Sequence, residues 1–219
     1  MNEFLSEKEQ VELIRQWWRE YGWYLIGGMA ISALGYFGWN QYQAQQLQVA
    51  EGAAALYLNL QEAVDDDSEG EANELLAQLR SDYAGSPYTD HAGLLIASDY
   101  LIADSGRAVD ELRHVVASTR DRELGLIARL RLARVQAYRE EYQDALEALD
   151  IEEPGQFAAR ISEIKGDIYF AQEETGAALA AYTDALTAAG SGGLDRNFVQ
   201  MKLNNLRVTE FTAAEQAGQ

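Results

Sequence analysis

The sequence predicts an all-α protein in which one long apolar helix near the N-terminus precedes a solenoid of paired helices and a closing helix. Three observations support this prediction. The stretch 21–50 carries no charged residue. Beyond it, apolar residues recur at helical spacings, and no period-2 run is long enough to build a sheet. Small residues in this second part repeat with a period of 33 residues, which is typical of stacked helical hairpins.

Residues 21–42 of the charge-free stretch are predicted to form a transmembrane helix. As an α-helix, residues 22–39 rise roughly 27 Å, and extension to Tyr42 gives about 30 Å, the hydrocarbon thickness of a bilayer. Aromatic rings favour the two membrane interfaces. The expected interfacial anchors are Trp17, Trp18, Trp23 and Trp39. Five glycines keep a helix buried in a large core open as an alternative, whereas five preceding acids argue against a cleaved signal peptide.

Small residues follow one face of this predicted membrane helix. Gly28, Ser32 and Gly35 stand at positions i, i+4 and i+7, a spacing that lets another membrane helix approach closely. We interpret this face as a helix-interaction surface. The alternative is that glycine and serine are merely tolerated inside a membrane.

The basic residues around this helix predict its orientation. Three of them occur in residues 1–20, an expected amphipathic segment, and none follows the apolar stretch until Arg80. By the positive-inside rule, we expect a single-pass protein whose N-terminus is cytoplasmic and whose large domain lies across the membrane, an arrangement that a bacterial periplasm suits. The segment 1–20 either lies at the lipid headgroups or docks a cytosolic partner. A net charge of −19 argues against nucleic acid as a partner, and the absence of cysteine suits an exported domain.

The segment ahead of the apolar stretch carries a distinctive motif made of Glu7, Glu9, Gln10, Ile14, Trp17, Trp18 and Gly22. It resembles the N-terminal signature of a family of bacterial inner-membrane proteins, the single-span, tetratricopeptide-like ancillary subunits of the Sec translocon. The similarity continues to about Leu206. The resemblance implies association with Sec translocon subunits and with a membrane-anchored periplasmic prolyl-isomerase-like chaperone, in assistance to exported proteins. Unfolded exported proteins are further candidate partners.

The repeats predict a tetratricopeptide-like domain over 43–206. In such repeats a small residue on each helix lets two backbones approach, while a larger residue fills the groove beside them. The predicted packing residues are Ala133, Ala145, Gly166, Tyr169, Ala178, Tyr182 and Ala185. Gln136 occupies a position where the pattern expects an aromatic ring.

Helix boundaries are predicted where Pro, Gly and Ser gather. Ser86 and Pro87 are expected to start a helix as N-cap and first residue. Further breaks are expected at 105–106, 118–121, 154–155 and 190–193. Residues 194–206 are predicted to form the closing cap helix. The small and polar residues 207–219 are predicted to be a disordered tail.

The residues that catalysis requires are scarce. The chain has no cysteine, two histidines and no Gly-rich phosphate loop, so we expect neither an enzyme nor a bound cofactor. The loop 65–70 matches the start of a calcium loop, but Leu76 stands where a bidentate Glu is required. We interpret it as a solvated loop and expect no metal site.

Eight arginines fall within the 33 residues 107–139 of this otherwise acidic chain. One interpretation is a docking patch for an acidic partner surface. Its candidate residues are Arg120, Arg122, Arg129 and Arg131. The alternative is intramolecular pairing with neighbouring acids such as Glu123, Glu140 and Glu141.

The sequence therefore predicts a membrane-anchored periplasmic protein-protein interaction module, and the resemblance implies that it serves the Sec translocon. A scaffold subunit of another cell-envelope assembly complex is the alternative, because a repeat fold specifies no partner.

Overall fold

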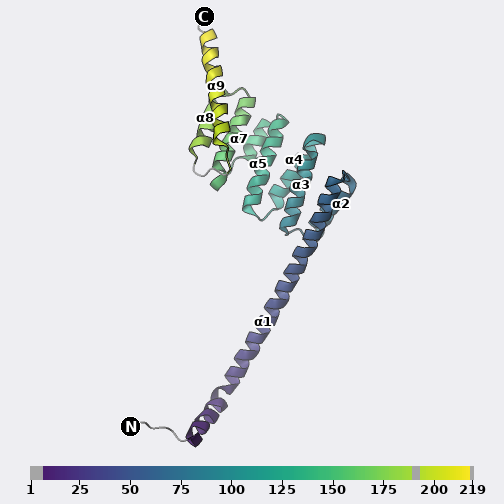
Figure 1. The fold of residues 1–219 in the computed structure, drawn as a ribbon, viewed down its shortest axis with the longest axis vertical. Helices are drawn as coiled ribbons and strands as arrows, with labels where there is room; N and C mark the ends of the chain where they lie inside the picture. The colour runs from purple at the N-terminus through teal and green to yellow at the C-terminus, as the bar shows by residue number, and fades with distance from the viewer. Residues whose placement is uncertain (1–6, 189–192, 218–219) are drawn as a thin grey trace, which may run out of the picture. The chain divides into compact units, whose positions relative to one another are not determined.

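The computed structural model describes residues 7–188 and 193–217, in which the regular elements are helices (Figure 1). Their bounds are α1 Glu7–Asp65, α2 Glu69–Asp82, α3 Pro87–Ala103, α4 Ser105–Ser118, α5 Arg122–Tyr138, α6 Tyr142–Ala148, the 3₁₀ helix η1 Gly155–Phe157, α7 Ala158–Ala171, α8 Thr175–Thr187 and α9 Arg196–Ala217. The chain divides into two compact units, 1–52 and 53–219. The predicted all-α class is confirmed.

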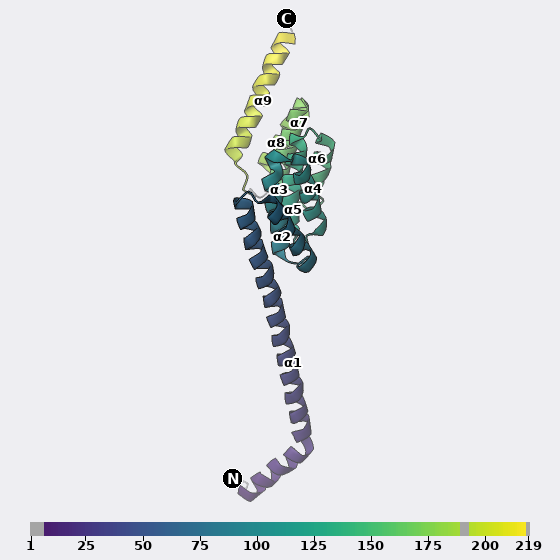
Figure 2. The same ribbon diagram turned by 90° about the vertical axis from the view of Figure 1, so that its right-hand side faces the viewer.

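The first unit contains most of α1, which runs without a break from Glu7 through the apolar stretch and bends near its N-terminal end (Figure 2). Within the described residues, no helix is both long enough and apolar enough to cross a membrane. The predicted transmembrane helix over 21–42 is therefore not supported. The reason lies in its composition, because five glycines and several polar-tipped aromatic rings lower its mean hydropathy.

The second unit is a solenoid of antiparallel helical hairpins. The hairpins α3–α4, α5–α6 and α7–α8 follow one another, and each helix packs against its neighbours (Figure 1). The end of α1, from residue 53 to residue 65, forms a looser first pair with α2, and the two helices share one buried cluster. The second unit begins at Ala53, later than the predicted residue 43, because Ala53 is the first α1 side chain in the buried cluster.

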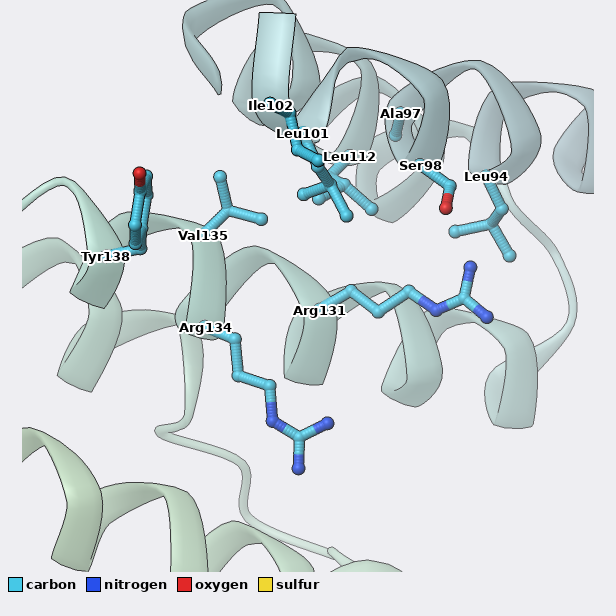
Figure 3. A pocket seen from close by; sticks show the side chains of 10 residues that line it. All are labelled: Leu94, Ala97, Ser98, Leu101, Ile102, Leu112, Arg131, Arg134, Val135 and Tyr138. Atoms are coloured by element: carbon cyan, nitrogen blue, oxygen red, sulfur yellow. The ribbon is translucent and has the colours of Figure 1, made fainter. Parts of the chain in front are cut away.

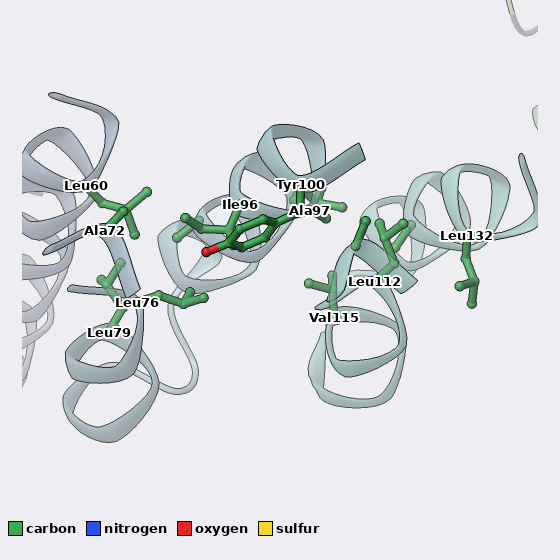
Figure 4. Close-up of a cluster of buried hydrophobic side chains, with 14 of the residues drawn as sticks. Leu60, Ala72, Leu76, Leu79, Ile96, Ala97, Tyr100, Leu112, Val115 and Leu132 are labelled. Carbon is green, nitrogen blue, oxygen red and sulfur yellow. The ribbon is translucent and has the colours of Figure 1, made fainter. Parts of the chain in front are cut away.

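The core of the solenoid consists of three buried clusters that follow one another along the helices. Leu60 of α1, Leu76 and Leu79 of α2, Ile96 of α3, Leu112 of α4 and Leu132 of α5 belong to one buried cluster (Figure 4). A second cluster lies between α5, α6 and α7, and a third between α7, α8 and α9. Each hairpin therefore buries its apolar side chains against the next one, as repeat proteins do.

The predicted helix start at 86–87 and the predicted break at 118–121 are both confirmed, and each is followed by a capped helix. The Ser86 side chain accepts a hydrogen bond from the Tyr88 backbone N–H at 3.3 Å, and Pro87 is the first residue of α3. Asp121 accepts bonds from the Glu123 and Leu124 backbone N–H groups at 2.8 and 3.0 Å, which caps α5. The predicted break at 190–193 lies largely outside the described residues.

The C-terminal helix is longer than the sequence analysis predicts. Val199, Leu203 and Leu206 are buried, as expected of a cap helix, but α9 continues to Ala217. The predicted disordered tail over 207–219 is thus helical as far as 217, since this part contains helix-forming Ala, Glu and Gln and has no Pro. Residues 218–219 lie outside the described residues.

Candidate interaction surfaces

The predicted packing residues of the last repeat meet between α7 and α8. A Cβ atom built on Gly166 would lie 2.6 Å from two ring carbons of Tyr182. Ala178, Tyr182 and Ala185 are buried, and Tyr169 packs against the same cluster. In the preceding repeat, Ala133 of α5 and Ala145 of α6 are fully buried in one cluster.

A second close approach, between α3 and α4, is not among the sequence predictions. A Cβ atom on Gly93, in the middle of α3, would lie 2.6 Å from a methyl carbon of Val115 on α4. The sequence feature that indicates this contact is a glycine inside an otherwise unbroken helical pattern, since such a glycine often allows close backbone packing.

An ionic network joins α9 to α7. The Lys202 ammonium lies 2.7 and 2.9 Å from the Asp167 carboxylate oxygens and 3.2 Å from Glu163. Glu163, only 4% exposed, also accepts a bond from Arg160 at 2.8 Å. The Tyr182 hydroxyl donates to Asp167 at 2.7 Å. Burial, together with this hydrogen bond and the Asp167 charge, raises the pKa of Tyr182 well above its usual value.

Four of the eight arginines in residues 107–139 have a partner inside the chain. Arg113 bonds Asp144 at 3.3 Å, Arg122 bonds Glu153 at 2.8 Å and Arg139 bonds Glu141 at 2.8 Å. Arg107 bonds Asn73 and lies over the Tyr100 ring. The other four have neither a hydrogen bond nor an ion pair with any described residue; they are Arg120, Arg129, Arg131 and Arg134.

The four residues of the predicted docking patch do not share one surface. Arg120, Arg122 and Arg129 line a shallow hollow that also contains Asp121, Asp150, Glu152 and Glu153. Arg131 lies elsewhere, because two residues along a helix turn a side chain by about 200°. Acids already surround the first three, so this hollow offers a mixed surface.

Arg131 belongs to a different site, a groove of about 480 Å³ between α3 and α5 (Figure 3). The sequence pattern does not reveal this groove, because its walls come from separate repeats. Its lining is mostly apolar and includes Leu94, Ala97, Ser98, Leu101, Ile102, Leu112, Arg131, Arg134, Val135 and Tyr138. Ile102 is fully exposed and Tyr138 is 80% exposed.

The candidate face on α1 is open. A Cβ atom on Gly28 or Gly35 would meet nothing within 4 Å. The Ser32 hydroxyl donates to the Gly28 carbonyl at 2.9 Å, so its polar group is satisfied within the helix. The expected anchors Trp17, Trp18, Trp23 and Trp39 are all exposed.

No group of His, Asp and Glu side chains able to hold a metal ion occurs in the described part of the chain. A solenoid of helical hairpins with an apolar groove defines, by its architecture, a protein-interaction module of the tetratricopeptide type. A family model described as a tetratricopeptide repeat-like domain matches residues 15–208. The chain belongs to this family.

Similarity to individual proteins identifies a more specific family within the tetratricopeptide repeat-like proteins. Several proteins named ancillary SecYEG translocon subunit match this chain. The Neisseria gonorrhoeae protein is 30% identical, and the match covers 93% of this chain and 98% of the relative. The Aggregatibacter actinomycetemcomitans protein is 27% identical over 92% of this chain and 98% of the relative, and the Escherichia coli K12 protein is 26% identical over 95% of this chain and 100% of the relative. The resemblance of the N-terminal motif is thereby confirmed, and the chain belongs to the family of these subunits. It is a family of non-enzymatic interaction proteins, so the chain is not an enzyme.

Proposed function

We propose that this chain is an ancillary subunit that associates with the Sec translocon through its helical repeats and its N-terminal helix. The observation that carries the proposal is the extent of the match. The E. coli relative named for this association is covered along its whole length, together with 95% of this chain. The N-terminal helix and the repeats are therefore both inside the region of similarity.

The proposal extends to attachment at the inner membrane, with residues 21–42 as the anchor and the repeats in the periplasm. Its support is the surface of α1, which exposes large apolar side chains along 21–42 and carries no charge there. A helix that is apolar all round needs an apolar environment. Gly28 and Gly35 are among the glycines that lower the hydropathy of this helix. Because they have no side chain, they also leave its surface open to close approach by a neighbouring membrane helix.

A second proposed partner is a membrane-bound periplasmic prolyl-isomerase-like chaperone, which this subunit would hold near emerging exported proteins. Two separate candidate surfaces support such a dual role. The open face of Gly28, Ser32 and Gly35 is suited to a membrane helix, whereas the α3–α5 groove is suited to a segment outside the membrane.

Co-purification tests the association. The full chain, tagged and expressed near its natural level, should recover translocon subunits and the chaperone from membranes in mild detergent. An unrelated single-span inner-membrane protein is the control. Recovery of a different envelope assembly complex in place of the translocon would favour the scaffold alternative.

Protease accessibility tests the topology. Protease added to intact spheroplasts should digest the chain beyond about residue 50 and leave a protected N-terminal fragment. Complete protection of the repeats would place them on the cytoplasmic side and contradict the proposal.

A further inference from the structure

We propose that the α3–α5 groove binds an acidic amphipathic helix of a partner protein, whose apolar side chains enter the groove and whose carboxylates pair with Arg131 and Arg134. This inference rests on the proposed function, in which the repeats hold a protein partner, and it specifies the chemistry of that partner.

The apolar lining supplies the first argument. The apolar side chains that line the groove come from three helices: Leu94, Ala97 and Leu101 of α3, Leu112 of α4 and Val135 of α5 (Figure 3). At the end of α3, Ile102 leaves its entire side chain in solvent. A concentrated apolar surface of this kind marks a binding site in a soluble domain. A volume of about 480 Å³ lies within the range of ligand-binding clefts.

The charge of the groove supplies the second argument. Arg131 and Arg134 stand three positions apart on α5 and both line the groove; the Arg131 side chain runs along it towards Leu94, whereas the Arg134 side chain points away from the α3 side chains, at the outer edge of the groove (Figure 3). Neither pairs with any described residue, although the chain carries a net charge of −19 and has many carboxylates. The two guanidinium groups therefore remain available to an external acid.

The next repeat shows the contrasting arrangement. Asp167 follows Arg134 by one repeat period of 33 residues, and its charge is satisfied within the chain by Lys202 of α9. On α7 the carboxylate of Asp167, at the same repeat position but of opposite charge, is thus neutralised by an ion pair inside the chain. Arg134 on α5 has no acidic partner among the described residues, which makes it a candidate for intermolecular pairing.

An acidic helix matches both features. Carboxylates at positions i and i+3 or i+4 repeat once per turn and so match the spacing of Arg131 and Arg134. Apolar residues beside them fall on the same face and can enter the cleft, as in other helix-in-groove complexes. A basic segment would be repelled by the two arginines.

Fluorescence anisotropy tests the proposal with the full chain in nanodiscs. The probe is a short labelled helical peptide with Leu and Phe along one face and two Glu residues one turn apart; its companion has Gln at both Glu positions. The Glu peptide should bind more tightly than the Gln peptide, and added salt should reduce the difference. The double variant Arg131→Gln/Arg134→Gln should weaken binding of the Glu peptide by about tenfold.

Two further variants make the result specific. Arg120→Gln/Arg129→Gln removes two equally unpaired arginines outside the groove and should leave binding unchanged. Ile102→Ser alters a fully exposed side chain, so folding should be retained, and it should weaken both peptides while preserving the preference for Glu. Thermal melting of each variant verifies that it folds.

Four outcomes would overturn the proposal: no binding of either peptide to the unmodified chain, equal binding of the two peptides, equal loss in the control double variant, or a change of oligomeric state caused by Arg131→Gln/Arg134→Gln. The last would assign the groove to a second copy of the chain. Recovery of the translocon by a chain that fails to bind the Glu peptide would refute only this inference. Peptide binding without recovery of the translocon would refute only the proposed function.

Discussion

The ring of Tyr182 lies directly on the backbone of Gly166, so that a methyl group on Gly166 would be 2.6 Å from two ring carbons. This contact sets the distance between α7 and α8. Tyr182 is only 2% exposed and its hydroxyl is bonded to Asp167. The ring therefore cannot rotate away to make room.

Replacement of Gly166 by leucine should reduce the free energy of unfolding by about 1–3 kcal/mol or more, because the added side chain overpacks this contact. Thermal or urea denaturation of the full chain would measure the change. Gly176→Ala on α8 is the matched control, since its Cβ atom would meet nothing within 4 Å. Equal melting of Gly166→Leu and the natural chain would refute the repeat assignment at this position.

Replacement of Tyr182 by phenylalanine should have an effect that depends on pH. The folded state raises the pKa of Tyr182 above the value near 10 of a free tyrosine, so the folded chain keeps this proton when the unfolded chain has lost it. The stabilisation is therefore complete below about pH 10 and decreases as the pH rises above it. Below pH 10, loss of the bond to Asp167 should cost about 1 kcal/mol.

Urea denaturation at a series of pH values would measure this difference between the natural chain and Tyr182→Phe. Tyr138→Phe is the control, because Tyr138 is 80% exposed. A difference for Tyr182→Phe that stays constant through alkaline pH would argue against the raised pKa.

Gln136 of α5 buries a hydrogen-bond acceptor that has no partner among the described residues. Gln136 is 2% exposed, and its Oε1 atom accepts no hydrogen bond within the described structure. Gln136→Leu should stabilise the chain by about 1 kcal/mol, because it removes a buried unsatisfied acceptor at similar volume. Gln143→Leu, at an exposed position of α6, should change the melting temperature little. A lower melting temperature for Gln136→Leu would show that the amide is needed where it is.

The sequence predicts those parts of the fold that depend on local chemistry. The Ser86–Pro87 start and the break at 118–121 follow from short-range rules, and the structure contains both. The length of α9 does not follow from the sequence prediction, because small and polar residues such as Ala, Glu and Gln are compatible with disorder but also favour helices.

The α3–α5 groove cannot be predicted from such local rules. Its lining joins α3, α4 and α5, so its existence depends on how successive hairpins stack. Proximity in the sequence was also misleading for the arginines. Arg129 and Arg131 are neighbours in the chain, but they line different hollows because a helix points them in nearly opposite directions.

The small-residue face of α1 gives a further prediction. Replacing Gly28, Ser32 and Gly35 together by leucine should leave membrane association intact or strengthen it, since leucine is more apolar. It should reduce crosslinking to membrane partners, because three large side chains prevent close approach of another helix. Crosslinking in membranes compares this variant with a control that carries leucine at Gly27, Ala30 and Ala33. Undiminished crosslinking would restrict partner binding to the repeats.

Photocrosslinking in intact cells tests the central claim that this chain works as a translocon subunit. A photoreactive amino acid would replace Ile102, whose fully exposed side chain lies at the interaction groove, and Gln143 in a control chain. Adducts with a Sec translocon subunit or its membrane-bound chaperone should form from position 102, and they should be lost in the Arg131→Gln/Arg134→Gln background. Adducts from position 102 that contain no translocation component, or that form equally from position 143, would show that the groove does not bind a translocon partner.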